Sequence, residues 1–462
     1  MKSRFVLEPA RQLPVIHEAD ICVLGGSGTG LFAAVRAARL GAKVVIVEKQ
    51  NCFGGVATIS MVNAWHSLMD TEFKRDVIAG LSAEMVQRLK KRGSIYAIER
   101  SHSFGFVFNS EEFKIDLDEL AQENRLKIYL HTMFVAPHLE EGKLAGVIVE
   151  NKSGRGVILA RYFIDATGDG DLCARLPGVE CYYAEHMQPA TTCARFSGWP
   201  AQRLSNIETG IDLGRGFDVG ALVREHGREV GMPEGFMWGC YVPNSDVYMM
   251  AGTRIYGTNP ADADDLTRAE IEGRRQVRAV MDLIRRYQPH PNFALQALPA
   301  RLGLRESRHV HCLHRLTGEE VLWGKGFDDA IANGSYRVDI HHHDKPGITL
   351  RYLDGTQEYA CPGRPKQTSR WREATAENPT FYQIPLRAMI PRGPFENLLI
   401  AGRMIDADEQ AHAAIRVMVN MNQTGEAAGV ACWLAMQENR PIAQLDPAKL
   451  RRALAEGGSI IL

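Results

Sequence analysis

The sequence has no excess of charge of either sign and no long apolar run. Its 54 lysines and arginines balance 55 aspartates and glutamates, which leaves a formal net charge of -1. A balanced chain has no overall positive field for a nucleic-acid backbone, so we expect no nucleic-acid partner. The apolar run at residues 429–436 is far shorter than the roughly 18 residues that a membrane-spanning helix needs. We therefore expect no transmembrane segment.

Cysteine is sparse, and its nine residues are scattered along the chain. No two of them have the Cys-x-x-Cys spacing of a zinc site or a thioredoxin-like motif, and none cluster as an iron–sulfur centre requires. A disulfide reductase is therefore not expected, and the cysteines are interpreted as reduced, buried thiols of a cytoplasmic protein. No export signal is expected either, because Glu8 and Pro9 interrupt the amino terminus before an apolar core develops.

A glycine-rich turn near the amino terminus predicts a phosphate-binding site. Residues 20–24 are typical of a buried strand, residues 25–30 are Gly-Gly-Ser-Gly-Thr-Gly, and residues 31–40 favour a helix. Such a turn lets the backbone approach a pyrophosphate, whose charge is held by the N–H groups and dipole of the helix. Ser27 stands where the Gly-x-Gly-x-x-Gly pattern has its middle glycine, and serine is small enough to fit. A plain tight turn is the alternative interpretation.

Other segments predict further contacts with the same ligand. Glu48 ends the next buried strand, 18 residues after Gly30, near the spacing at which an acid accepts hydrogen bonds from a ribose diol. A double glycine, Gly54-Gly55, follows that strand. Residues 162–171 and 397–403 each contain a buried strand that runs into glycine. Several separated segments are therefore expected to converge on one dinucleotide without a 2′-phosphate.

Together these segments resemble the FAD-dependent oxidoreductase family whose flavin domain is related to glutathione reductase and to the fumarate reductase and succinate dehydrogenase flavoproteins. The similarity covers nearly the whole chain and includes residues 302–308 and 415–418. It implies FAD, with its adenine end on the first βαβ unit, its ribityl chain near Gly54, Gly55 and Asp169, and its flavin facing a second domain. The cofactor-binding residues that we expect are Gly25, Gly26, Ser27, Gly28, Thr29, Gly30, Glu48, Lys49, Gly54, Gly55, Val56, Ala57, Phe134, Ala166, Thr167, Gly168, Asp169, Gly402, Arg403, Val417 and Met418.

The predicted fold class is α/β: a Rossmann-like FAD-binding domain with a parallel sheet and a β-meander, plus a mixed α+β substrate domain. The FAD-binding domain is expected to be discontinuous, over residues 15–175 and 385–440, because the βαβ rhythm stops near residue 176. Residues 176–384 form the expected substrate domain, and residues 441–462 form a carboxyl-terminal tail.

Three further segments have helical signals. Residues 73–92 carry apolar residues at four-residue steps, Asn109 and Glu112 have the spacing of a capping box, and residues 266–287 form a long charged segment. The arginines of the last segment either belong to a solvated face, the more usual outcome, or form a docking patch for an anion.

The end of the predicted FAD-binding domain carries a positively charged candidate. Residues 420–436 predict a buried helix, whose beginning near Arg416 would direct N–H groups at the N1 and C2=O edge of a flavin. Arg416 would add a full charge there. The alternative is a structural ion pair of Arg416 with Asp406, Asp408 or Glu409.

His341 is the favoured catalytic base. It follows a predicted strand over residues 335–340, and the resemblance implies that this strand approaches the ligand. Histidine titrates near neutral pH and suits the removal of a proton as hydride leaves. A surface histidine turn is the first alternative. A metal site shared with His311 and His314 is the second, but their spacing is irregular and no metal is expected.

Two other residues complete the catalytic candidates. Arg305 lies in a segment of alternating charge that is typical of a strand, and is expected to hold a carboxylate or hydroxyl group of the substrate. An internal bridge to Glu306 is the competing interpretation. His66 follows Gly55 by 11 residues and is expected beside the flavin.

The sequence therefore predicts an FAD-dependent dehydrogenase that transfers hydride between a small polar organic substrate and FAD bound between two domains. The electron acceptor is left open, and a homo-oligomer is compatible with the sequence. The first alternative is a flavoprotein without net redox turnover, such as an isomerase, a hydratase or a redox-gated binding protein. The second is a flavin-dependent RNA-modifying enzyme, which the balanced charge disfavours.

Overall fold

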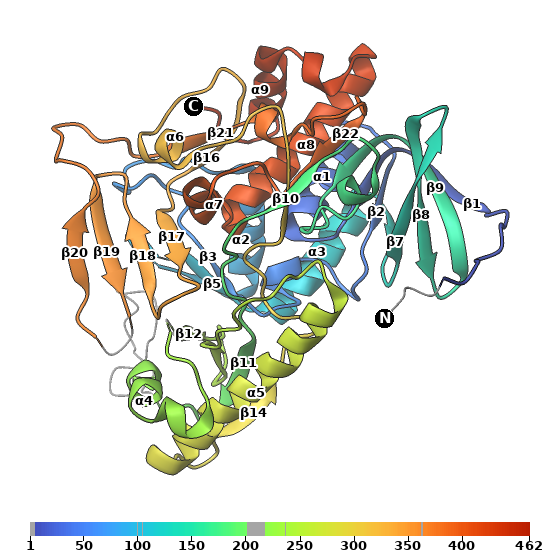
Figure 1. The fold of residues 1–462 in the computed structure, drawn as a ribbon. Helices are drawn as coiled ribbons and strands as arrows, with labels where there is room; N and C mark the ends of the chain where they lie inside the picture. The colour runs from blue at the N-terminus through green and yellow to red at the C-terminus, as the bar shows by residue number, and fades with distance from the viewer. Residues whose placement is uncertain (1–4, 99, 104, 201–217, 236, 362–363) are drawn as a thin grey trace.

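A seven-stranded sheet organises the molecule (Figure 1). The computed structural model describes residues 5–98, 100–103, 105–200, 218–235, 237–361 and 364–462. The first four residues of the amino-terminal segment and residues 201–217 of the expected substrate domain therefore lie outside the described residues. Across the sheet the strands are β6 (Lys127–Tyr129), β2 (Val44–Val47), β1 (Val15–Leu24), β9 (Gly154–Asp165), β8 (Lys143–Asn151) and β7 (Met133–Glu140), with β22 (Leu398–Ile400) paired to β9.

The parallel strands of this sheet end in register at their carboxyl ends. Strands β6, β2, β1, β9 and β22 are parallel. Leu24 at the end of β1 pairs with Val47 and with Asp165, and Asp165 pairs with Ile400. Open α/β sheets bind ligands at this edge. The other edge is an antiparallel meander of β7, β8 and β9, so the predicted α/β class with a parallel sheet and a meander is confirmed.

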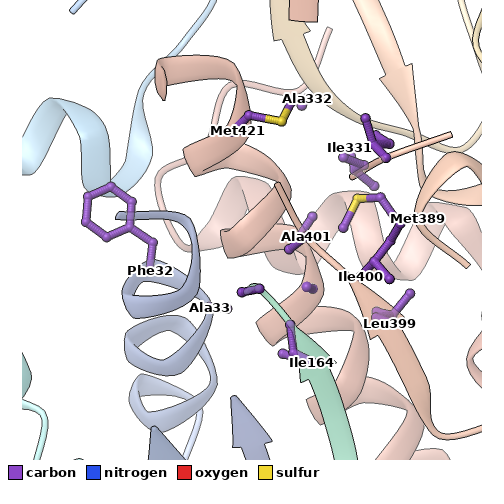
Figure 2. Close-up of a cluster of buried hydrophobic side chains, with 14 of the residues drawn as sticks. Phe32, Ala33, Ile164, Ile331, Ala332, Met389, Leu399, Ile400, Ala401 and Met421 are labelled. Carbon is purple, nitrogen blue, oxygen red and sulfur yellow. The ribbon is translucent and has the colours of Figure 1, made fainter. Parts of the chain in front are cut away.

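Two helices, α1 (Gly28–Arg39) and α8 (Met418–Glu438), pack against each other with their amino termini at the same end. A Cβ atom on Gly425 would lie 1.9 Å from the carbonyl oxygen of Thr29, and one on Gly429 would lie 2.2 Å from that of Ala33. Both positions therefore require glycine. Figure 2 shows Ala33 in a buried cluster with side chains of β9, β22 and α8.

Other helices cover the same core. They are α2 (Gly80–Arg92), α3 (Ser110–Glu123), α6 (Gly318–Leu322), α7 (Glu409–Ile415) and α9 (Pro447–Glu456). Helix α9 packs on α8, and the Arg36 guanidinium of α1 donates to the carbonyl oxygen of Leu454 at 3.1 Å. The residues expected to form a tail thus contain a packed helix.

Within the described residues, no helix combines the length and apolar character that crossing a bilayer requires.

A second apolar core lies between α5 (Ala263–Tyr287) and a four-stranded antiparallel sheet. The strands of that sheet are, in order, β12 (Trp238–Tyr241), β13 (Tyr248–Ala251), β11 (Cys193–Ser197) and β14 (Ala294–Ala297), and α4 (Val219–His226) packs against α5. Arg274 and Arg275 pair with acids of α5 itself, and Arg286 pairs with Glu229. These pairs are typical of a solvated charged face.

Smaller antiparallel sheets complete the fold. The sheet of β17 to β20 stands at the side of the molecule opposite the meander (Figure 1). The remaining strands are β17 (Val338–His341), β18 (Ile348–Arg351), β19 (Thr356–Ala360), β20 (Gln367–Arg370), β3 (Ala64–Trp65), β5 (Phe106–Phe108), β4 (Ile95–Ala97), β10 (Cys181–Tyr183), β15 (Arg308–Val310), β16 (Ala330–Gly334) and β21 (Tyr382–Pro385).

Two local predictions need correction. The helix expected from residue 73 begins at Gly80, because the Asp70 carboxylate accepts from the Lys74 N–H and Phe73 has a positive φ of 54°, which close a turn. Asn109 caps α3 by accepting from the Glu111 N–H, but Glu112 does not complete the capping box. Its carboxylate accepts a hydrogen bond from the Ser94 hydroxyl instead.

We predict that Gly429→Ala destabilises the protein. Alanine is the better helix former by about 1 kcal/mol, but its Cβ would overlap the Ala33 carbonyl oxygen at 2.2 Å. Overpacking of this kind costs roughly 1–3 kcal/mol or more, so we expect a lower denaturant midpoint for the purified protein. Gly326→Ala is the control, because its Cβ would meet only the Gln383 Oε1 atom, at 3.7 Å. A Gly429→Ala protein as stable as the parent would contradict this packing.

Candidate functional site

A cavity of about 380 Å³ opens at the carboxyl edge of the parallel sheet. It is lined by most of the predicted cofactor-binding residues, namely Gly25, Ser27, Gly28, Thr29, Glu48, Lys49, Gly54, Gly55, Val56, Ala57, Phe134, Ala166, Thr167, Gly168, Gly402, Arg403, Val417 and Met418. All four catalytic candidates line it as well: His66, Arg305, His341 and Arg416. Three predicted cofactor-binding residues, Gly26, Gly30 and Asp169, are not among the lining residues.

The glycine-rich turn has the tight geometry that its sequence predicts. Gly25 has a φ of 99°, and a Cβ there would lie 2.3 Å from the carbonyl oxygen of Ala166. Ser27 caps α1, with its hydroxyl accepting from the Gly30 N–H at 3.3 Å. Serine at the unusual middle position therefore supports the helix start. The amino terminus of α1 faces the cavity, with the positive end of its dipole toward any ligand there.

Both carboxylate oxygens of Glu48 are held by backbone N–H groups, one of them in the glycine-rich turn. Oε2 accepts from the Gly26 N–H at 2.6 Å, and Oε1 accepts from the Gln50 N–H at 2.8 Å. Each oxygen keeps a second lone pair, so the carboxylate can also accept from a ribose hydroxyl. The side chain is only 8% exposed, which fixes its direction.

A buried carboxylate, Asp169, holds cations along the cavity. The Arg403 and Arg301 guanidinium groups donate to it at 2.5 and 2.9 Å, and the Lys49 ammonium lies 3.9 Å away. Although burial opposes ionisation, the two arginines hold the pKa of Asp169 below its ordinary value. All three cations line the cavity. Sequence reasoning did not identify Arg301, although it immediately precedes the segment at residues 302–308.

The far end of the cavity is formed by β17 and the start of α8. Arg416 donates to the Asp339 backbone carbonyl at 3.1 Å and to its carboxylate at 3.4 Å. The sequence had suggested Asp406, Asp408 or Glu409 as an ion-pair partner, and that alternative is wrong. Asp408 instead caps α7, so its carboxylate is already bound to the Ala411 N–H.

His341 is a buried neighbour of the same carboxylate. Its Nε2 atom lies 3.3 Å from the Asp339 carboxylate, and its side chain is only 6% exposed. The alternative of a surface histidine turn is therefore wrong. Burial, helped by the charge of Arg305, lowers the pKa of His341 well below its ordinary value. Burial opposes ionisation of Asp339, but His341 and Arg416 hold its pKa well below the ordinary range.

The suggested metal site of His341 with His311 and His314 is not formed by the described side chains. His311 lies 3.9 Å from Asp406, and His314 lies 3.0 Å from Glu320. Each imidazole thus has a different acid as its neighbour: His311 and His314 lie in the connection between β15 and α6, whereas His341 ends β17 and lies next to Asp339.

Arg305 lies in a bend before β15, not in a strand. Its Nη1 atom donates to the Pro189 carbonyl at 2.6 Å and to the Thr191 hydroxyl at 2.8 Å. Glu306 does not pair with it, because that carboxylate contacts His309 at 3.1 Å. Burial lowers the pKa of Arg305 well below its ordinary value.

His66 and Tyr336 line the cavity near Arg337. The His66 and Tyr336 rings stack with centroids 3.9 Å apart, and the His66 Nδ1 atom hydrogen-bonds to the Ser103 carbonyl oxygen. Burial lowers the pKa of His66 to about 3, so this imidazole is neutral at physiological pH. Sequence reasoning did not identify Tyr336, Arg337 or Asp339 as site residues, although all three belong to the segment that predicted His341.

The sequence profile of the FAD dependent oxidoreductase family matches residues 20–454, which is nearly the whole chain. The chain belongs to the FAD dependent oxidoreductase family. It is therefore an oxidoreductase with FAD as its cofactor, as the resemblance in the sequence implied.

Several proteins are similar to this flavoenzyme. Digeranylgeranylglycerophospholipid reductase of Methanosphaerula palustris is 26% identical over 234 residues, 48% of this chain and 52% of that relative. Mitochondrial dihydrolipoyl dehydrogenase of Schizosaccharomyces pombe is 29% identical over 108 residues, 21% of each chain. The matches thus span about a fifth to a half of these relatives' own length. A solved geranylgeranyl bacteriochlorophyll reductase-like protein from Thermoplasma acidophilum has a TM-score of 0.47 and 14% identity, covering 95% of this chain and 84% of that one.

The chemistry of the cavity fits FAD. The turn at Gly25 leaves no room for a side chain, and two helix amino termini, of α1 and α8, meet the same cavity. Backbone N–H groups and helix dipoles suit a pyrophosphate, and Lys49, Arg301 and Arg403 add positive charge. The residues present are therefore those that an anionic dinucleotide requires.

We predict that Glu48→Gln weakens FAD binding roughly tenfold or more. Both carboxylate oxygens already accept from backbone N–H groups, so the single amide oxygen of glutamine would leave no acceptor for a ribose hydroxyl, whose charge-assisted hydrogen bond is worth about 1.5 kcal/mol or more. Titration of apoprotein with FAD, followed by flavin fluorescence, measures the change. Glu141→Gln, in the exposed turn after β7, is the matched control and should bind FAD normally. Equal affinities of both variants would contradict the role of Glu48.

Proposed function

We propose that this flavoenzyme is a dehydrogenase that transfers hydride between a small polar organic substrate and FAD. The observation that carries the proposal is the buried His341–Asp339 pair in the wall of the cavity that also receives α1 and α8. Bound FAD supplies the hydride chemistry itself. The protein must then bind both molecules, orient them, exclude water and move a proton.

Cofactor binding is assigned to the residues at the sheet edge. The α1 amino terminus at Ser27 and Gly28 would hold the pyrophosphate, and Glu48 would accept from the ribose of the adenosine. At the other end, the α8 amino terminus at Val417 and Met418 would direct N–H groups at the N1 and C2=O edge of the flavin. Because α1 and α8 are held together, these two contacts have a fixed separation.

Proton transfer is assigned to His341. A carboxylate only accepts hydrogen bonds, so the His341 Nε2–H group donates a hydrogen bond to Asp339 at 3.3 Å. In the neutral ring the Nδ1 atom then carries the lone pair, which can accept a proton from a substrate O–H or N–H group. Asp339 fixes this tautomer and would stabilise the imidazolium once the proton has moved.

Substrate orientation is assigned to the arginines around this pair. Arg305 and Arg416 line the cavity together with Arg337, and Asp339 is the acid beside them. Arg305 has one nitrogen fixed by Pro189 and Thr191, which holds the guanidinium plane in place. Such a surplus of oriented positive charge suits a substrate with a carboxylate or another polar oxygen group. A homo-oligomeric assembly and a cytoplasmic location stay predictions.

The direct test is anaerobic titration of FAD-loaded protein with polyols, hydroxy acids and amines, one compound at a time, while the visible absorption of the flavin is recorded. A substrate of the proposed reaction bleaches the oxidised flavin bands. If none of these classes reduces the flavin and the reduced protein also transfers no hydride to the corresponding carbonyl or imine compounds, the dehydrogenase proposal is wrong.

We predict that His341→Gln slows flavin reduction by substrate about 10²- to 10⁴-fold, the usual contribution of a general base. Glutamine has a similar size but cannot take the proton. Stopped-flow absorbance with a substrate found by the titration measures the rate constant. The control is His342→Gln, since His342 contacts Thr349 and is not among the cavity-lining residues. A normal rate in His341→Gln would remove this residue from the chemistry.

The rate of flavin reduction should stay constant as the pH falls from 7 to 5.5. His341 acts as a base only when neutral, and burial keeps its pKa well below the ordinary value of 6.5. Protonation therefore abolishes activity only well below pH 6.5. The rate constant should be measured with a substrate that does not itself titrate there, while the flavin spectrum reports retention of the cofactor. An acid limb centred near pH 6.5 would show that His341 has an ordinary pKa or is not the base.

A further inference from the structure

A second cluster of ionisable side chains lies outside the cavity. Glu306 precedes β15, His309 belongs to β15, and His412 belongs to α7. All three side chains are at most 2% exposed. One carboxylate oxygen, Glu306 Oε1, lies 3.1 Å from His309 Nε2 and 3.6 Å from His412 Nδ1, and the three atoms lie within 4.8 Å of one another.

The outer nitrogens of both rings fix the tautomers. His309 Nδ1 lies 3.0 Å from the Ile405 carbonyl oxygen, and His412 Nε2 lies 3.2 Å from the Arg403 carbonyl oxygen. A carbonyl oxygen can only accept, so both of these nitrogens carry a proton. In neutral rings the inner nitrogens therefore present lone pairs to the same carboxylate oxygen. Three electron-pair donors then face one point in the interior.

A cation between the three atoms would satisfy all of them. A single additional proton on His309 would satisfy its contact with Glu306 but would leave His412 Nδ1 with a lone pair facing the same carboxylate. The His412 Nδ1 atom has no hydrogen-bond partner, although it is buried. A metal ion would engage all three atoms at once. The backbone carbonyls that accept from the outer nitrogens are also the usual second partners of metal-binding histidines.

We propose that Glu306, His309 and His412 form a binding site for a divalent transition-metal ion of the zinc type. Two imidazole nitrogens and one carboxylate oxygen are a donor set that zinc and its first-row neighbours take, and a water can complete the coordination. This differs from the sequence-based expectation of no metal, because His412 joins Glu306 and His309 only in the fold.

The metal ion would have a structural role beside the proposed substrate site. Glu306 Oε2 accepts from the Gln188 N–H at 3.2 Å, and Gln188 Oε1 accepts from the His341 N–H at 3.2 Å. Glu306 also directly follows Arg305 in the chain. A metal ion at Glu306 would therefore fix β15, α7 and the backbone around His341 in one arrangement, while its own burial keeps it from the substrate.

The first experiment measures the metal content of FAD-loaded protein by mass spectrometry, before and after chelation, followed by Zn²⁺ titration against a competing indicator. We expect about one equivalent of Zn²⁺ per chain. Glu306→Gln and His309→Ala should each reduce the uptake at least tenfold. The matched control is His311→Ala, because His311 lies two residues away on the same segment and contacts Asp406 instead. Uptake by His309→Ala equal to that of the parent would overturn the site.

A measurement on the unmodified protein keeps the proposal testable if a variant fails to fold. Co²⁺ added to the chelated, FAD-loaded protein should give visible ligand-field bands of a nitrogen- and oxygen-ligated ion, and Zn²⁺ should remove them. The flavin spectrum, unchanged throughout, shows that the fold is retained. Protein that takes up neither Zn²⁺ nor Co²⁺ would show that a proton alone joins the three side chains. None of these readouts depends on the proposed dehydrogenase activity.

Discussion

The close contact between α1 and α8 is the constraint on which the rest of the structure depends. Gly425 and Gly429 let two helix backbones approach to a distance that any side chain would prevent. Since the two helices are parallel, their amino termini open into one cavity. In the proposed binding mode, a dinucleotide that is anchored at its phosphates by one helix would meet the second helix at its other end. Helix packing, rather than any single binding residue, sets the length of the site.

Buried carboxylates organise the charge around this cavity. Asp169 orients Arg301 and Arg403, while Asp339 orients Arg416 and His341. In both places the acid holds its partners in fixed positions, so that they would face a ligand without having to reorganise. Asp169 does not line the cavity, and its effect on the ligand is transmitted by the cations that it holds.

Local patterns predicted the parts of the fold that local chemistry controls. The turn around Gly25, the strand before Glu48 and the meander follow from glycine spacing and apolar runs, which do not depend on distant residues. The partner of Arg416 and the place of Arg301 could not be predicted this way. Asp339 lies 77 residues before Arg416, and Asp169 lies 132 residues before Arg301. Only the packed fold selects these partners from the many acids in the chain.

The pairing of β22 with β9 has a consequence for synthesis on the ribosome. Leu398 pairs with Phe163, and α8 follows still later in the chain. At roughly 5–20 residues per second, translation leaves this edge of β9 without its partner for on the order of 10 to 50 s. Until α8 has been synthesised, the apolar face of α1 has no packing partner. This face is then accessible to chaperones and to other chains. The proposed cofactor contacts of α8 can therefore form only late in the maturation of this protein.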